Sequence, residues 1–504
     1  MTSPLVVVCV DGGDERIVDR LLAAGRLPFL EQFSARGSRV EVGTVAAILE
    51  ECMWGPLLAG VPPGDHALAH FLEFDAPSQG LRLRRESELE PFWMHLADRG
   101  RDCLAFDVPE SHPHPESRAD EVCGWSELSP PHRPLFTSSE VRRKVRLAGR
   151  PAKLADAAPR ASPRHEQRLV AELVANEARR FQAIAPLLSG RPAACIGVHE
   201  THVVVHALGH HADVGFHWRA PAAPQPDLVE RPYVALDRLL ADVAAGVRGA
   251  NVAVVFARGI RPANHAGPLL EGLLERAGLL VKSGGMRSGA GTAGGRVPLA
   301  ERLRRFVPDR TRERLATALL PRSMQLRMAS TAFRDAYDWS QTVMFPLKSW
   351  GAGLLRVNLM GRELFGTVAG EDRDDLLARV RLLIRETINA DTGRPLAAEV
   401  HDSSEFPGRM AHRLPDLVIT WAGDRPARRA SHPQLGTWEA VVWPDRWTEH
   451  RGKATVLLAG PGVACSPRIR DAQPDGLAPT LLALCGIRPP STMAGSAWRD
   501  VLSG

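Results

Sequence analysis

Two histidines of this 504-residue chain have the residue type and the spacing of a metal site. His202 and His206 stand four residues apart in the string HETHVVVH, so on a helix their rings lie on one face. His450 stands in the string EHRGKATVLLAG near the end of the chain. Three neutral imidazoles with one open position form a catalytic zinc arrangement, and they also suit iron, manganese, cobalt or copper. If a third histidine such as His450 joins this pair, the set predicts one divalent metal ion, zinc first, with iron or manganese as alternatives.

A plainer interpretation of the same segment stays open, in which these histidines are core or surface residues that bind no metal. Histidine is crowded here, with further copies at His199, His210, His211 and His217. We expect the adjacent pair, His210 and His211, to be exposed at the end of a helix.

Strands of a sheet must position the candidate residues. The apolar run Leu5–Val10 predicts a buried parallel strand that ends at Asp11. Ala194–Val198 predicts a strand that runs into the histidines, and Val252–Phe256 predicts another that ends just before Arg258. Because such strands alternate with helical stretches, the sequence predicts an α/β fold with a mostly parallel central sheet and helices on both faces.

The pattern changes in the third quarter of the chain. The segment Asp372–Ile388 has the apolar spacing of an amphipathic helix. We expect residues 262–430 to form an inserted cap region, with additional strands and basic helices, over a core made of residues 1–261 and 431–504. Arg356 lies in this insert, and we expect it on the surface.

Composition narrows the class of partner. Apolar content of 44% and charged content of 24% are ordinary for a globular protein, and the net charge of +5 does not indicate nucleic acid. No run approaches the ~20 apolar residues of a membrane span. The seven cysteines form no CxxC pair and suit reduced thiols. We therefore expect a cytoplasmic protein without nucleic-acid or membrane partners.

Several strings, taken in order, resemble one enzyme family. They are VVVCVDGGD at the start, MWGPLLAGVPPGDHAL, VNLMGRELFGTV, and LAGPGV near the end. Together they resemble the type I phosphodiesterase/nucleotide pyrophosphatase branch of the alkaline-phosphatase superfamily. The resemblance implies an alkaline-phosphatase-like sandwich, two zinc ions and a threonine nucleophile.

The resemblance implies that most ligands of the family's first metal are retained in this chain. His206 and His450 match two of its ligands, and His202 replaces the aspartate that is the third. If Glu50 also reaches this metal, the set becomes three histidines and one carboxylate.

The second metal and the nucleophile are rewritten. Asp11 matches the strand-one aspartate that binds the second metal, and Glu50 stands in the position of the threonine, with Glu51 as the alternative one residue on. Ala257 and Arg258 stand where the family has an aspartate and a histidine ligand. The resemblance thus implies a single metal and a carboxylate in place of the nucleophile.

Arg258 brings a fixed positive charge to the place of a dication. It would neutralise Asp11 and Glu50, which would otherwise be two carboxylates in one cleft. It could equally clamp a phosphate, sulfate or carboxylate group of a small anionic substrate with its two-pronged guanidinium. The sequence favours neither of these two roles of Arg258 over the other.

Three functions follow as hypotheses. The first is a metallohydrolase for a phosphate, sulfate or related ester, with metal-activated water, Glu50 as general base and Arg258 stabilising negative charge. The second is a non-hydrolytic metalloenzyme, an oxygenase or lyase with a three-histidine, one-glutamate site. The third is a binding protein that has lost catalysis.

Overall fold

The computed structural model of the chain describes most of the sequence. The residues described are 3–43, 53–70, 72–83, 89–126, 128, 134–147, 151, 162–212, 223–283, 322–349, 351–423, 425–440, 448–465 and 468–503. Among them, none of the helices combines the length and the apolar character that a membrane span requires.

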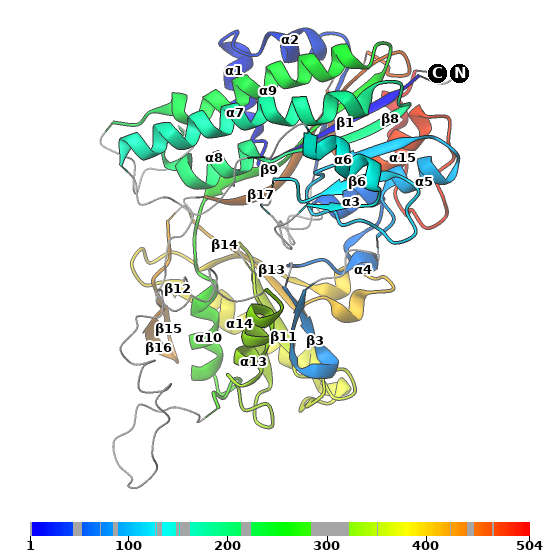
Figure 1. Cartoon of the computed structure of the whole chain (residues 1–504). Coiled ribbons are helices and arrows are strands. Elements are labelled where there is room, and N and C mark those ends of the chain that lie inside the picture. The colour runs from blue at the N-terminus through cyan, green and yellow to red at the C-terminus, as the bar shows by residue number, and fades with distance from the viewer. Residues whose placement is uncertain are drawn as a thin grey trace.

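A nine-stranded sheet forms the core of the larger lobe, which is the upper part of Figure 1. Most neighbouring strands run parallel, whereas β17 lies antiparallel to both of its neighbours. The strand order is β18 (Ile469–Ala472), β2 (Ser38–Val42), β17 (Thr448–Ala459), β9 (Asn251–Pro262), β1 (Leu5–Asp11), β8 (Ala193–Val198), β5 (Cys103–Phe106), β6 (Asp120–Cys123) and β7 (Leu135–Phe136).

Helices cover both faces of this sheet, and this explains why β1 is apolar along its whole length. Val6 and Val8 pack into one hydrophobic cluster, while Val7 and Cys9 pack into another on the opposite face. The first face carries α1 (Glu15–Ala23), α2 (Pro28–Ser34), α6 (Ser139–Leu147), α7 (Pro163–Leu188), α8 (Glu200–Leu208) and α9 (Pro226–Gly246). The second carries α3 (Trp54–Ala59), α5 (Phe92–Asp98) and α15 (Leu477–Leu484).

A second, smaller lobe has its own hydrophobic cluster. Its four-stranded sheet has the order β10 (Met344–Pro346), β11 (Gly353–Val357), β14 (Leu417–Trp421) and β13 (Ala397–Asp402). A three-stranded sheet follows the order β12 (Ile388–Asn389), β15 (Arg429–His432) and β16 (Gly436–Glu439). The helices are α10 (Gly267–Arg276), α13 (Arg322–Arg334) and α14 (Arg373–Glu386), and the hairpin β3 (Leu72–Asp75) and β4 (Gly80–Leu83) packs here as well, after the short helix α4 (Pro63–His66).

The predicted fold class is confirmed by this architecture. The predicted helix at Asp372–Ile388 is α14, with Leu377, Val380 and Ile384 as its buried face. The division into core and cap stays a prediction, and the predicted boundary at residue 430 falls within β15.

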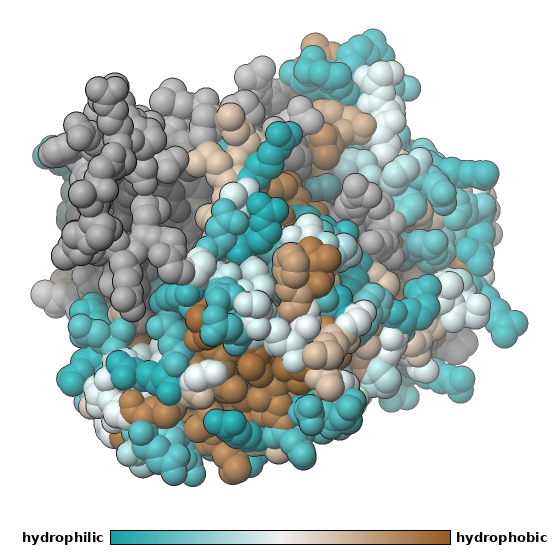
Figure 2. Space-filling view, turned by 90° about the horizontal axis from the view of Figure 1, so that it is seen from below, coloured by the Kyte–Doolittle hydropathy of each residue, from teal (hydrophilic) through white to brown (hydrophobic). Residues whose placement is uncertain are grey.

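The surface of the smaller lobe is of mixed character. The face seen from below in Figure 2 carries hydrophobic side chains gathered in a patch, and exposed apolar residues of this lobe include Met328, Leu364 and Phe365. The expectation that Arg356 is a surface residue is wrong. Its side chain is buried, and its guanidinium donates to Glu363 and to the carbonyl of Leu414.

A buried arginine ties together the strand ends that lead into the histidine segment. Arg180 of α7 has no exposed surface, and its Nη1 lies 2.7 Å from Asp107 Oδ2 and 2.8 Å from the carbonyl oxygen of Gly197. Its Nη2 lies 3.0 Å from Glu200 Oε1, at the first residue of α8. The guanidinium also stacks over the Trp125 ring at 4.9 Å. Arg180 therefore fixes the start of α8 against the ends of β5 and β8.

We predict that Arg180→Met lowers the free energy of unfolding by about 3–5 kcal/mol, because it leaves two buried carboxylates without their cation. Urea denaturation followed by circular dichroism measures this loss. Arg168→Met is the matched control on the same helix, since its exposed pair with Glu172 contributes at most about 1 kcal/mol. Equal stabilities of the two variants would contradict the role given to Arg180.

Candidate metal centre

The candidate residues meet at the edge of the sheet where the parallel strands end. β1 ends at Asp11, whose register partner on β9 is Ala257, and β8 leads directly into α8. Ligand sites of α/β sheets lie at this carboxyl edge. Gly12 turns the chain there with φ +67°, and a Cβ atom on it would lie 2.6 Å from His202 Cα. Glycine at this position thus lets α8 approach the end of β1.

The three histidines predicted as ligands come together in the interior. His202 and His206 stand on one face of α8, and His450 reaches them from β17. All three are buried, and the ligand atoms of the set lie within 4.8 Å of one another. His206 Nε2 and His450 Nε2 are 3.2 Å apart. Two nitrogens that bind one tetrahedral zinc ion at normal bond lengths are separated by about 3.3–3.4 Å, so the pair fits such an ion.

The outer nitrogen of each ring faces an oxygen. His206 Nδ1 lies 3.0 Å from the carbonyl oxygen of Thr448 and 2.8 Å from the hydroxyl of Thr448, which donates its own proton to the carbonyl of Val205. His450 Nδ1 lies 3.1 Å from the carbonyl oxygen of Arg258. His202 Nδ1 lies 3.1 Å from Asp11 Oδ2. A carbonyl oxygen can only accept, so the protons of the His206 and His450 rings stand on Nδ1 and their Nε2 lone pairs face inward. This is how proteins orient histidine ligands, and the donor set therefore fits a divalent metal.

Burial and charge keep the ring of His450 neutral. Burial, Arg258 and the two other histidines hold its pKa well below the ordinary value. A neutral ring is the form that binds metal.

Asp11 lies among positively charged and hydrogen-bond-donating side chains. Its Oδ1 lies 3.5 Å from Arg258 Nη1 and accepts from Trp54 Nε1 at 3.2 Å. Burial alone would raise the pKa of Asp11, but Arg258 and His202 hold it well below its usual range. The carboxylate is therefore ionised and already has partners on both oxygens.

Arg258 is held between two carboxylates. Besides Asp11, its Nη1 contacts Glu110 Oε1 at 2.7 Å. Its backbone lies in the left-handed region, with φ +63°, which is costly for a residue with a side chain and typical of functional sites. The contacts favour charge compensation over the substrate clamp, since an anion would have to compete with Glu110.

Not every predicted site residue can be placed. Glu50 and its alternative Glu51 lie outside the described residues. The sequence analysis did not predict Glu110 or Thr448. Glu110 lies in a loop after β5, and Thr448 contacts His206 through its main-chain carbonyl and its hydroxyl, which no motif indicates. The only available signal for Glu110 was its position shortly after the strand Cys103–Phe106.

A second cluster of donors lies at the end of α8. Glu166, His210 and His211 are all buried, so the expectation that the two histidines are exposed is wrong; the first turn of α7 covers them. The main-chain N–H of Gln225 donates to His211 Nδ1, so the proton of a neutral ring stands on Nε2, which lies 3.3 Å from Glu166 Oε2. A protonated Nε2 beside a carboxylate forms a pair without a metal.

Comparison with known proteins identifies the fold. No family model matches the chain, and no curated protein matches its sequence. The phosphonoacetate hydrolase of Sinorhizobium meliloti, solved with phosphonoacetate, is similar in structure with a TM-score of 0.51 and 14% identity over 96% of each chain. Human ectonucleotide pyrophosphatase/phosphodiesterase 5 is similar with a TM-score of 0.50 and 11% identity over 100% of each chain. The chain therefore shares the overall fold of these two enzymes, which is the fold that its motifs predicted.

Proposed function

We propose that the chain is a metal-dependent enzyme that hydrolyses or transfers a phosphate, sulfate or related ester group of a small anionic substrate at a single metal ion. The observation that carries the proposal is the set of three buried histidines, whose ligand atoms lie within 4.8 Å of one another and whose Nδ1 atoms lie near oxygens. The names of the two structural relatives, a phosphonoacetate hydrolase and a pyrophosphatase/phosphodiesterase, support substrates that carry a phosphorus-containing anion.

The residues around the ion would have distinct roles. When bound, a zinc ion supplies Lewis acidity and makes water nucleophilic near neutral pH. Asp11 orients the ring of His202 and increases its basicity. Glu50, in the place of the family's threonine, is our candidate for the general base that takes a proton from water.

Arg258 would replace the charge of the family's second metal. A guanidinium cannot lose its proton near neutral pH and cannot bind water as a ligand, so it supplies charge without supplying a nucleophile. The divalent ion and Arg258 together balance the three carboxylates Asp11, Glu110 and Glu50, so an anionic group can approach the ion without net repulsion.

A non-hydrolytic metalloenzyme is the second candidate. The observation in its favour is that the described ligand set consists of imidazoles alone, which suit iron, manganese or copper as well as zinc. The identity of the bound metal separates the two candidates.

We predict that the protein purified without chelator holds about one equivalent of divalent metal. His206→Ala should lose this metal and the hydrolysis of bis(p-nitrophenyl) phosphate and p-nitrophenyl sulfate together. Elemental analysis beside the activity assay tests both. His401→Ala, a histidine of β13 paired with Glu399, should keep metal and activity.

The outcomes separate the hypotheses. Zinc supports the hydrolase, whereas iron, manganese or copper would favour the non-hydrolytic enzyme. Two equivalents would contradict the single-ion site, and no metal would favour the binding protein.

We predict that Asp11→Asn weakens metal binding about 10- to 100-fold, because a neutral amide no longer holds and polarises the ring of His202. Competition with a chromophoric chelator measures the affinity. The control is Asp19→Asn on α1, which removes an ion pair with Arg39 of β2 and should leave the metal affinity unchanged. Unchanged affinity in Asp11→Asn would show that the carboxylate does not support the ligand.

We predict that Arg258→Met lowers the free energy of unfolding by about 3 kcal/mol, since the buried Asp11 and the half-buried Glu110 lose their common cation. The double variant Arg258→Met/Glu110→Gln should be more stable than the single variant, because one uncompensated charge is gone. Denaturant titration of metal-free protein tests both, and equal stability of the single and double variants would rule out charge compensation.

A further inference from the structure

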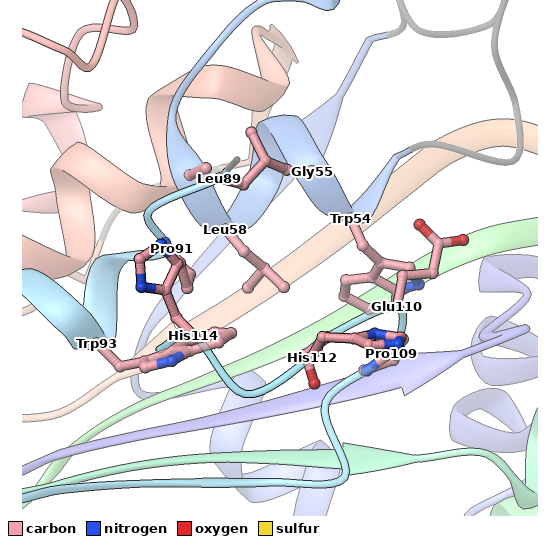
Figure 3. A pocket seen from close by; sticks show the side chains of 12 residues that line it. Trp54, Gly55, Leu58, Leu89, Pro91, Trp93, Pro109, Glu110, His112 and His114 are labelled. Atoms are coloured by element: carbon pink, nitrogen blue, oxygen red, sulfur yellow. The ribbon is translucent and has the colours of Figure 1, made fainter. Parts of the chain in front are cut away.

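One carboxylate stands between Arg258 and the space beside the candidate metal centre. Glu110 lines both of two neighbouring pockets at the connection from β5 to β6, whereas Arg258 is not among the described walls of either. Figure 3 shows Glu110 and Trp54 toward the same end of the larger pocket. A molecule that enters from there meets the carboxylate of Glu110 before it meets the guanidinium of Arg258, which is almost fully buried.

The backbone fixes the position of Glu110. Its φ of +58° is left-handed, and Ser111 closes the turn by donating from its hydroxyl to the carbonyl of Val108 at 2.7 Å. Asp107, three residues earlier, is also left-handed, with φ +52°. Two left-handed residues with side chains in one loop cost free energy, and such strain is typical of functional sites. The loop therefore holds Glu110 against Arg258 before any ligand binds.

Arg258 lies within reach of a ligand on the ion. Asp11 joins the two places, because its Oδ2 lies 3.1 Å from His202 Nδ1 and its Oδ1 lies 3.5 Å from Arg258 Nη1. The carbonyl oxygen of Arg258 also lies 3.1 Å from His450 Nδ1. A short substrate with two anionic groups could therefore place one group at the ion and direct the other at Arg258.

Glu110 opposes this second contact. Arg258 Nη1 already faces Glu110 Oε1 at 2.7 Å and Asp11 Oδ1 at 3.5 Å. A second anionic group near Arg258 would lie beside both carboxylates, and like charges repel strongly where water is largely excluded. Proteins gain specificity from such repulsion of the wrong ligand as well as from attraction of the right one.

We infer that Glu110 is a specificity-determining residue, which keeps Arg258 from binding a second anionic group and thereby restricts the site to substrates with one such group. This inference rests on the proposed function and narrows its substrate class. The substrates are esters whose remaining part carries no further phosphate, sulfate or carboxylate. Arg258 then contributes charge to the site without being a binding point for the substrate.

The test compares methylphosphonate with phosphonoacetate, which differ by one carboxylate, by calorimetry on the zinc-loaded full chain. The unmodified protein should bind phosphonoacetate no more tightly than methylphosphonate. In Glu110→Gln the extra carboxylate gains a charge-assisted hydrogen bond to Arg258, so the ratio of the two affinities should shift about 10-fold toward phosphonoacetate. Glu110→Asn, which suits the left-handed backbone, takes its place if Glu110→Gln fails to fold.

Two further variants show where the shift comes from. Arg258→Met added to Glu110→Gln should return the ratio to that of the unmodified protein, because the cation that attracts the second group is gone. Glu116→Gln removes an exposed carboxylate of the same connection and is the control that should keep the unmodified ratio.

Tighter binding of phosphonoacetate than of methylphosphonate by the unmodified protein would overturn the inference. An unchanged ratio in Glu110→Gln, or a shift that persists when Arg258 is also replaced, would overturn it too. If neither anion binds the zinc-loaded chain, the proposed function fails, and the exclusion is tested on metal-free protein by thermal unfolding with pyrophosphate. Stabilisation of Glu110→Gln alone, and not of the unmodified protein or Glu110→Gln/Arg258→Met, would support the exclusion. Any other pattern would overturn it.

Discussion

The geometry of the site depends on the hydrogen bonds and ion pairs that the buried guanidinium of Arg180 makes. It places one cation between the end of β5, the end of β8 and the first residue of α8. Two buried carboxylates, Asp107 and Glu200, share this cation, and its removal would leave both without it. Because α8 carries two of the three candidate ligands, the position of the histidines follows from a charge that itself never contacts them.

A second buried arginine changes what the site can do. Arg258 occupies the surroundings of Asp11 where the motifs of the family imply another metal, and it brings Glu110 with it. A metal ion can release or exchange ligands during a reaction, whereas a guanidinium only holds them. On the proposed function, the Arg258 half of the site would be a fixed electrostatic environment, and bond making would be concentrated at the histidine half.

Much of this arrangement could be predicted from particular residues. The i,i+4 spacing of His202 and His206 fixes their shared helix face, and Asp11 and Arg258 follow from their places at strand ends. Glu110 could not be predicted, because its direction comes from a left-handed turn that no periodic pattern announces. The burial of His210 and His211 also comes from tertiary packing, since residues of α7 far earlier in the chain cover them.

Gly12 has a consequence for how this site can vary. Because Gly12 has no side chain, the backbone of α8 can lie directly against the end of β1. Alanine at this position would both clash and strain the left-handed turn, so the spacing between Asp11 and His202 cannot be adjusted in small steps. Redesign of the site for a larger metal complex would have to begin from β17, which among the described strands approaches it antiparallel to its neighbour β9.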